Sequence, residues 1–326
     1  MMRLPAFTYA APRSIDEAAR ILAGEGPQAM LVAGGTDLYP NMKRRQQSPR
    51  VLIGLRGIRE LSGITGIPTT GLSIGACTTL TDLSTHRLVV ESYPALSRAV
   101  RTISTPILRN MGTIGGNICL DTRCNYYDQS YEWRRAINFC MKCDGDTCWV
   151  APSSRTCLAV NSSDSVPLLC AIGATVRLAG THGHREIAMR DFYNKDGIRY
   201  INKQPDEIVT HIALPPVNGW SATYHKLARR GSFDFPVLGV AVAMWRDPDG
   251  TVLDARIYLN AVASAPVEAA EARQALIGHK PTPDLIAHAS HLASINAKPM
   301  DNTDLDYAWR KKMVRVYVRR ALNGLS

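Results

Sequence analysis

The sequence has no long apolar run, and this absence limits where the protein can reside. A helix needs roughly 18 or more consecutive apolar residues to cross a bilayer. No part of the 326-residue chain provides such a stretch. Residues 1–7 also lack the apolar core of a secretory signal. We therefore expect a cytoplasmic protein without a membrane span.

Motifs for nucleic-acid binding are absent too, although the net charge is +10. The basic residues are spread along the chain, and the densest group lies at 310–320. There the cations alternate with apolar residues, which is typical of the solvated face of an amphipathic helix. A docking surface for an acidic partner subunit is the alternative interpretation. No nucleic-acid partner is expected.

Internal repeats and low-complexity tracts are also missing, and the length allows two or three globular domains. The first fifty residues have a β–α–β pattern, with Ser14 starting a helix as the first residue of a capping box. Pro215-Pro216 marks a candidate boundary, and the last hundred residues are typical of an α+β unit with helices after Pro266 and Pro281. Strands are expected at 29–32, 51–54, 72–75, 237–245 and 255–262.

Two glycine-rich turns stand out, at 33–38 and at 110–117. Adjacent glycines permit positive φ angles and bring successive backbone amides close to a ligand, which suits an anion such as pyrophosphate. The first turn lies between an expected strand and an expected helix, whose N-terminus adds partial positive charge. Neither turn matches the dinucleotide fingerprint or the P-loop, so a tight chain connection is the alternative for each.

Short motifs occur at intervals along the chain, among them 32–38, 74–80 and 112–118. In these motifs, and over nearly its whole length, the chain resembles the FAD-binding medium subunits of the xanthine dehydrogenase and carbon monoxide dehydrogenase family. The resemblance implies an α+β fold. A two-lobed FAD-binding domain of the PCMH type would occupy 1–218, with lobes at about 1–57 and 58–218. A C-terminal α+β domain of the CO dehydrogenase flavoprotein type would occupy 219–326. The motifs that carry the resemblance occur in the family's order, at 32–38, 74–80, 112–118, 164–169, 224–227 and 234–236.

The same resemblance implies which residues bind FAD. The two glycine turns would hold the pyrophosphate, Asp164 would approach the ribityl or ribose part, and Lys226 would approach the edge of the flavin ring. The alternatives are an ordinary helix N-cap for Asp164 and a solvated surface lysine for Lys226. The implied FAD-binding residues are Leu31, Val32, Ala33, Gly34, Gly35, Thr36, Asp37, Leu38, Gly112, Thr113, Gly115, Gly116, Asn117, Asp164 and Lys226.

Cysteine is concentrated in one segment, because five of the eight cysteines lie between 124 and 157. In a cytoplasmic chain such a group indicates metal or redox chemistry more than disulfides. Cys140 and Cys143 have a spacing common to iron–sulfur and zinc sites. The polar segment at about 121–160 has little hydrophobic period, and a bound cluster would explain so long a loop. From spacing alone, an iron–sulfur cluster, structural zinc and unligated thiols all stay open.

This segment resembles the insert in the β subunits of 4-hydroxybenzoyl-CoA reductases, which carry FAD and an additional 4Fe–4S cluster. Carried over residue by residue, the implied cluster ligands are Cys124, Cys140, Cys148 and Cys157. Cys143 departs from that pattern and is either a spare thiol or the sign of a misassigned ligand.

Other residues near the insert have expected roles as well. The positive charge of cations close to the cysteines in the sequence would favour thiolate ligands. These cations are Arg123, Arg134, Arg135 and Lys142. Cys77, Cys119 and Cys170 have apolar sequence neighbours and are expected to be packed core thiols.

The resemblance implies a role in electron transfer. In the family, a large subunit holds the molybdenum cofactor and the substrate, and a small subunit holds 2Fe–2S clusters. The insert implies the reductive direction, in which a ferredoxin-like donor supplies electrons for dehydroxylation of 4-hydroxybenzoyl-CoA. The implied assembly is a dimer of heterotrimers. No catalytic residue toward the substrate is expected in this chain, because the cofactors perform the electron chemistry.

Two alternatives have different consequences. The first is the FAD subunit of an oxidative molybdenum hydroxylase, acting on an N-heterocycle or an aldehyde and passing electrons outward. A measured preference for ferredoxin over NAD or quinone would separate it from the reductive role. The second is a zinc-bound structural assembly subunit, against which the two glycine turns argue.

Overall fold

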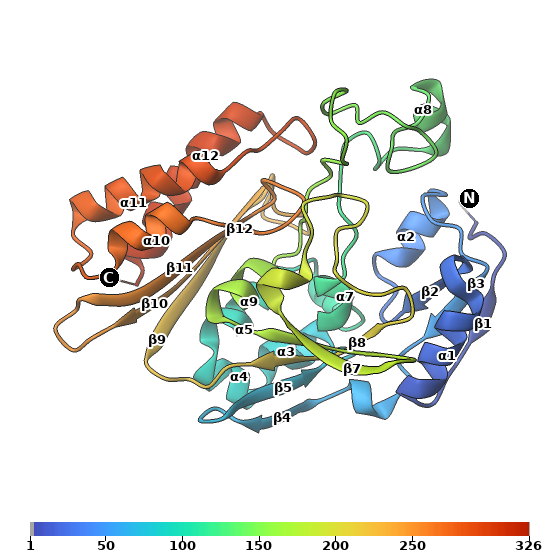
Figure 1. Cartoon of the computed structure of the whole chain (residues 1–326), viewed down its shortest axis with the longest axis horizontal. Helices are drawn as coiled ribbons and strands as arrows, with labels where there is room; N and C mark the ends of the chain where they lie inside the picture. Colours follow the sequence, from blue (N-terminus) through green and yellow to red (C-terminus); the bar gives the residue numbers. More distant parts are fainter. Residues whose placement is uncertain (1–2, 326) are drawn as a thin grey trace.

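The computed structural model describes residues 3–325, and within that range the strands form three sheets (Figure 1). The first sheet is parallel, with strand order β1-β3-β2. The Ser14 hydroxyl accepts a hydrogen bond from the Glu17 amide at 3.2 Å, so the first helix begins where the capping box predicts. The elements are β1 (Thr8–Ala10), α1 (Ile15–Glu25), β2 (Ala29–Val32), α2 (Leu38–Lys43) and β3 (Val51–Gly54).

The second sheet is antiparallel, in the order β4-β5-β8-β6-β7. β8 lies between β5 and β6, so this sheet joins chain from both sides of the cysteine insert. Its helices contribute Leu83, Val100 and Leu169 to one large apolar core. The strands are β4 (Ile64–Ile67), β5 (Gly71–Gly75), β6 (Thr175–Gly180), β7 (Gly183–Ala188) and β8 (Ile208–Leu214). The helices are α3 (Leu80–Thr85), α4 (Arg87–Ser92), α5 (Pro94–Arg101), α6 (Pro106–Arg109), α7 (Ile114–Ile118) and α9 (Val166–Ile172).

The third sheet, with order β12-β11-β10-β9, is antiparallel and carries three helices on one face (Figure 1). Val242, Ile257 and Val318 belong to the core between the sheet and the helices. The elements are β9 (Trp220–Leu227), β10 (Leu238–Arg246), β11 (Val252–Asn260), β12 (Val267–Glu268), α10 (Ala270–Leu276), α11 (Pro283–Asn296) and α12 (Tyr307–Asn323). The strands and helices expected from the sequence in this part are confirmed, with small shifts of their ends.

The cysteine insert stands away from the sheets, above the first lobe (Figure 1). Its one α-helix is α8 (Tyr131–Ala136), which the low hydrophobic period did not predict. A small apolar cluster fills the insert, and it is built from Cys124, Tyr127, Cys140, Cys157 and Ala159. The insert therefore has a core of its own, in which cysteines replace most of the usual aliphatic residues.

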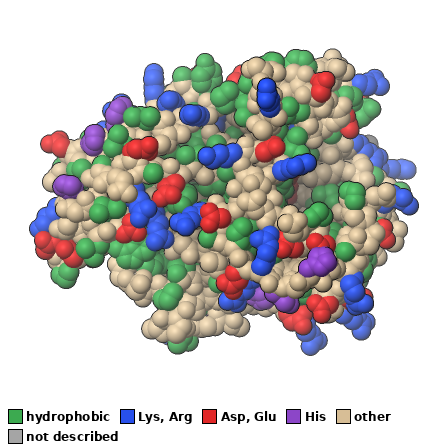
Figure 2. Space-filling model, viewed as in Figure 1, with side chains coloured by type: hydrophobic (Ala, Val, Ile, Leu, Met, Phe, Trp, Pro, Cys, Tyr) green, Lys and Arg blue, Asp and Glu red, His purple; other side chains and the backbone are tan. Residues whose placement is uncertain are grey.

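Charged residues mostly follow the expectation of a solvated surface. Figure 2 shows basic side chains interspersed with acidic ones across the face in view. Arg310 is an exception to the predicted solvated face of 310–320, because it is completely buried and donates to the carbonyls of Val237, Met300 and Ala261. Within residues 3–325, no helix is both long and apolar enough to cross a bilayer.

Candidate functional site

The first glycine turn connects the end of β2 to the start of α2, as its flanking pattern predicts. Gly35 has a φ of +70°, and a Cβ there would lie 2.3 Å from the Tyr39 ring. A Cβ on Gly34 would lie 1.9 Å from the Met111 carbonyl oxygen. A side chain is therefore excluded at Gly34 by its close neighbour, and at Gly35 by both its backbone angle and its close neighbour.

The amides of this turn are available to an anion. Among the described residues, the backbone N–H groups of Gly34, Gly35, Thr36 and Asp37 donate no hydrogen bond to the protein. Four consecutive unpaired amides in a partly buried turn need an external acceptor, and a phosphate group suits such a nest. A bound pyrophosphate fits the turn on these grounds.

The second glycine turn has a different structure from the first. Residues Ile114–Ile118 form the short helix α7, and Thr113 is its N-cap, accepting from the Gly116 amide at 3.1 Å. The Gly115 amide bonds to the Ala76 carbonyl, and a Cβ on Gly115 would lie 2.6 Å from the Ala76 Cβ. Close packing thus explains Gly115, and most amides here are already paired within the protein.

The two turns nevertheless meet in space. The Met111 carbonyl lies against Gly34, and a Cβ on Gly112 would be 3.4 Å from the Thr36 hydroxyl. The second turn therefore supports the first, although more than seventy residues separate them in the sequence.

Asp164 and Lys226 form a buried ion pair at 3.0 Å, with side chains only 5% and 9% exposed. The Tyr224 hydroxyl donates to the other Asp164 carboxylate oxygen at 2.7 Å, and Lys226 also donates to the Thr102 carbonyl. Burial raises the pKa of Asp164 to about 6, although Lys226 and Tyr224 oppose the rise. The N-cap of α9 is Ser165 and not Asp164, so neither alternative interpretation of this pair describes the structure.

A string of buried polar residues leads from Asp164 to the second turn. The Asn117 side-chain oxygen accepts from the hydroxyls of Ser163 at 2.8 Å and Ser165 at 2.6 Å. Nearby, the Ser162 hydroxyl and the Asn260 side-chain oxygen are buried and have no partner. Buried polar atoms without partners are costly, so they point to a ligand that supplies the missing hydrogen bonds.

The four cysteines assigned as cluster ligands come together in the insert. Cys124, Cys140, Cys148 and Cys157 are each 7% exposed or less, and no cysteine of the chain is in a disulfide. Burial raises the pKa of Cys124 to about 12, with further contributions from the other three thiols. Cys124, Cys140 and Cys157 pack in the same apolar cluster, and Cys148 acts electrostatically on Cys124 and Cys157. Between residues 3 and 325, no three His, Cys, Asp or Glu side chains form a group that could hold a single metal ion.

Cys143 is turned toward different partners. Its sulfur accepts from Arg134 Nη1 at 2.8 Å and lies 3.2 Å from an Asp144 carboxylate oxygen. Arg134 is 1% exposed and also donates to the carbonyls of Arg44 and Arg45. Cys143 is therefore attached to the first lobe through Arg134, while it also packs against the apolar cluster that contains Cys124, Cys140 and Cys157.

Two of the four cations named near the cysteines are buried beside them. Lys142 has a 6% exposed side chain, pairs with Asp121 at 2.8 Å and lowers the pKa of Cys157, which burial raises to about 11. Arg134 contacts Cys143 as described, whereas Arg135 is exposed. A positive charge enclosed with thiols favours their anionic form, as metal ligation requires.

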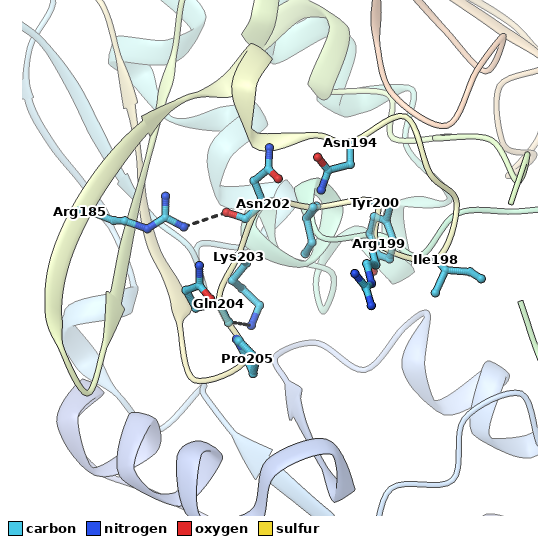
Figure 3. Close-up of a pocket in the computed structure, with 10 residues that line it drawn as sticks. Arg185, Asn194, Ile198, Arg199, Tyr200, Asn202, Lys203, Gln204 and Pro205 are labelled. Atoms are coloured by element: carbon cyan, nitrogen blue, oxygen red, sulfur yellow. Dashed lines mark hydrogen bonds between the residues drawn. The ribbon is translucent and has the colours of Figure 1, made fainter. Parts of the chain in front are cut away.

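Two cavities lie apart from these groups. One, of about 530 Å³, is lined by the loop from Asn194 to Pro205 and by Arg185, which donates to the Asn202 carbonyl (Figure 3). The other, of about 650 Å³, lies between Leu158 and the loop after β11. Neither cavity is lined by the residues that resemblance assigns to FAD or to the cluster.

Both parts of the chain match known protein families. Residues 5–217 match the FAD-binding domain in molybdopterin dehydrogenases, and residues 222–325 match the CO dehydrogenase flavoprotein C-terminal domain. The chain belongs to the family of FAD-binding subunits of molybdopterin dehydrogenases. It is thus an FAD-binding subunit of an oxidoreductase, and the predicted fold class is confirmed.

Individual family members align over most of the chain. The aldehyde oxidoreductase FAD-binding subunit PaoB of Escherichia coli (strain K12) is 33% identical, covering 83% of this chain and 86% of that protein. The carbon monoxide dehydrogenase medium chain of Afipia carboxidovorans is 30% identical, covering 97% and 95% respectively. A solved structure of carbon monoxide dehydrogenase from Hydrogenophaga pseudoflava has a TM-score of 0.82 at 30% identity, covering 99% of this chain and 98% of that one.

Several polar residues that contact Asp164 and Asn117 were not predicted from the sequence. Tyr224 contacts Asp164, and Ser163 and Ser165 contact Asn117. No sequence pattern distinguishes these tyrosine and serine residues from others in the chain. The run of four polar residues at 162–165 immediately before a buried helix was the available signal. Such a run is unusual because each residue in it is at most 3% exposed.

Proposed function

We propose that this chain is the flavin subunit of a molybdenum-containing oxidoreductase and that it carries a 4Fe–4S cluster in addition to FAD. The observation that carries the proposal is the gathering of four buried, disulfide-free thiols in an insert attached to an FAD-binding domain. Each sulfur of a 4Fe–4S ligand set binds a different iron, so the sulfurs stand farther apart than the ligands of one zinc ion. The preference for the cluster over zinc rests on the resemblance of the insert to that of the 4-hydroxybenzoyl-CoA reductases.

The pyrophosphate of FAD is assigned to the four free amides at 34–37, which the second turn supports through Met111 and Gly112. Leu31, Val32 and Ala33 bring the chain to that turn, and Leu38 begins the helix that follows it. Asp164, which accepts from Tyr224, is assigned to the ribityl or ribose part, and Lys226 to the flavin ring edge. When bound, FAD supplies both one-electron and two-electron chemistry.

Cys124, Cys140, Cys148 and Cys157 are the proposed cluster ligands, and Cys143 is a spare thiol. The contact between Cys143 and Arg134 supports this division, because a ligand sulfur would be directed at the other thiols. Lys142 lies inside the insert and offsets part of the negative charge of the ligand set.

The partners in this proposal are a large subunit with the molybdenum cofactor and a small subunit with 2Fe–2S clusters, assembled as a dimer of heterotrimers. Relatives named as medium chains or medium subunits support a multi-subunit assembly. A ferredoxin-like protein is the proposed electron donor, and the complex reduces a 4-hydroxybenzoyl-CoA-like thioester. The similarity of the insert to that of 4-hydroxybenzoyl-CoA reductases supports the reductive direction.

The oxidative direction is the second candidate, and a specific observation favours it. The relatives found by comparison include an aldehyde oxidoreductase subunit, carbon monoxide dehydrogenase medium chains and a nicotinate dehydrogenase subunit. Rates of flavin reduction by reduced ferredoxin and of flavin reoxidation by NAD or quinones separate the two directions. Faster exchange with ferredoxin supports the reductive role, and faster exchange with NAD or quinone supports the oxidative one.

Iron, acid-labile sulfide, zinc and flavin measured per chain, on anaerobically purified protein, test the cofactor assignment. We expect roughly four iron and one FAD, with an EPR signal after reduction that is lost in Cys140→Ser and Cys157→Ser. Cys143→Ser is the matched control, and it should keep both iron and signal. FAD with zinc in place of iron would contradict the cluster and leave an ordinary flavin subunit.

A further inference from the structure

Arg123 lies between the first glycine turn and the cysteine insert, and it contacts both. One guanidinium nitrogen is 3.2 Å from an Asp37 carboxylate oxygen, and the other is 3.4 Å from Asp128. Asp128 in turn accepts from the Cys124 amide at 3.2 Å. A single side chain therefore connects the turn assigned to pyrophosphate with the loop that holds an assigned cluster ligand.

The negative charge of Asp37 would repel an anionic ligand, and the guanidinium of Arg123 is placed to offset that charge. Asp37 provides the last of the four free amides, so a dianionic pyrophosphate bound to them would lie near its carboxylate, which also accepts from the Asn41 side chain at 3.0 Å. Burial raises the pKa of Asp37, Arg123 lowers it, and the carboxylates of Asp121 and Asp128 raise it further. An uncompensated carboxylate in this position would repel the ligand.

Contacts within the protein hold Arg123 in place. Its backbone exchanges two hydrogen bonds with Val160, at 2.9 and 2.8 Å. The Phe235 ring covers its guanidinium group at 4.1 Å, and the side chain is only 15% exposed. A counter-charge held in this way loses little conformational entropy when the ligand binds.

We propose that Arg123 is a positioning residue for FAD, which neutralises Asp37 and thereby makes the affinity for FAD depend on the folded insert. The inference rests on the placement of pyrophosphate in the first glycine turn given above. It goes beyond that placement, because it assigns the cysteine insert a role in flavin binding that is separate from holding a cluster. Loss of order in the insert should therefore release flavin as well.

The test measures the dissociation constant of FAD for the deflavinated full chain, by quenching of flavin fluorescence. We expect Arg123→Gln to raise the dissociation constant by roughly 10- to 100-fold, since one charge beside a diphosphate in a partly buried site is lost. Asp37→Asn alone should change it by less than about threefold. The double variant should bind within about threefold of wild type, because removal of the carboxylate removes the need for the arginine.

Controls separate charge from folding. Arg135→Gln removes the same charge from an exposed position in the same insert, and it should leave FAD affinity unchanged. Iron content and the far-UV circular dichroism of each variant report whether the insert and the fold are intact. If the double variant binds FAD as weakly as Arg123→Gln, the role of Arg123 is structural and the inference is overturned.

Other outcomes are equally distinct. Wild-type affinity in Arg123→Gln would overturn the inference while leaving the proposed function intact. Failure of the wild-type chain to bind FAD at all would defeat the proposed function first. Arg123→Lys should restore part of the affinity with an intact fold, since lysine keeps the charge but cannot contact two carboxylates in the same planar geometry.

Discussion

Replacing Lys226 with methionine should destabilise the protein by an amount that grows with pH. Lys226 and Asp164 are 3.0 Å apart in a buried site, and methionine keeps most of the length of lysine without its charge. In the wild type, the pKa of Asp164 is about 6 against an ordinary value of 3.8, because burial outweighs the help of Lys226 and Tyr224. Without Lys226 that pKa must rise further.

The magnitude follows from proton linkage. An acid whose pKa is raised on folding favours the folded state at low pH, and this stabilisation is lost as pH rises through the folded pKa. Wild-type Asp164 has released its proton above about pH 6, so its contribution is constant from there on. The variant still holds the proton, and its stability falls by about 1.36 kcal/mol for each further pH unit. Relative to the wild type, whose own loss ends near pH 6, the variant should therefore be destabilised by up to about 3 kcal/mol more at pH 8 than at pH 5.

Urea unfolding of the flavin-free chain at pH 5 and pH 8, followed by circular dichroism, measures this difference. The double variant Asp164→Asn/Lys226→Met should show no such pH dependence, because the titrating group is gone. Lys311→Met, at an exposed lysine of α12, should cost less than about 0.5 kcal/mol at either pH. If Lys226→Met were destabilised relative to the wild type by the same amount at pH 5 and at pH 8, the reasoning would be refuted.

Two further predictions follow from packing and from buried charge. Gly115→Ala should cost about 2 kcal/mol or more in urea unfolding, because its Cβ would lie 2.6 Å from Ala76, whereas Gly116→Ala meets only the Thr113 hydroxyl at 3.1 Å and should cost clearly less. Equal costs would contradict the close approach. Arg134→Met should cost about 3 kcal/mol, since the carbonyls of Arg44 and Arg45 lose a buried donor, while Arg135→Met on the exposed face of α8 should stay within about 0.5 kcal/mol. A small effect of Arg134→Met in the same unfolding assay would mean that water replaces the lost donor.

Local features of this protein were predictable because they depend on neighbouring residues. The Ser14 cap, the strand before Gly34 and the helix after Leu38 each follow from side chains within a few positions. The unusual content of the insert was also visible, because cysteine density needs no three-dimensional information. The helical state of 114–118 was not predicted, since adjacent glycines are poor helix formers and only packing against Ala76 compensates for them.

Tertiary structure alone decided which distant groups meet. Asp164 and Lys226 are 62 positions apart, and Asp37 and Arg123 are 86 positions apart. A pair of opposite charges has no sequence period, so nothing in the order of residues shows that the two will be buried together. The sequence determined that the thiols and glycine turns are available for cofactors. The fold determined which thiol turns to Arg134 and which amides stay free, because burial and backbone pairing depend on the whole chain.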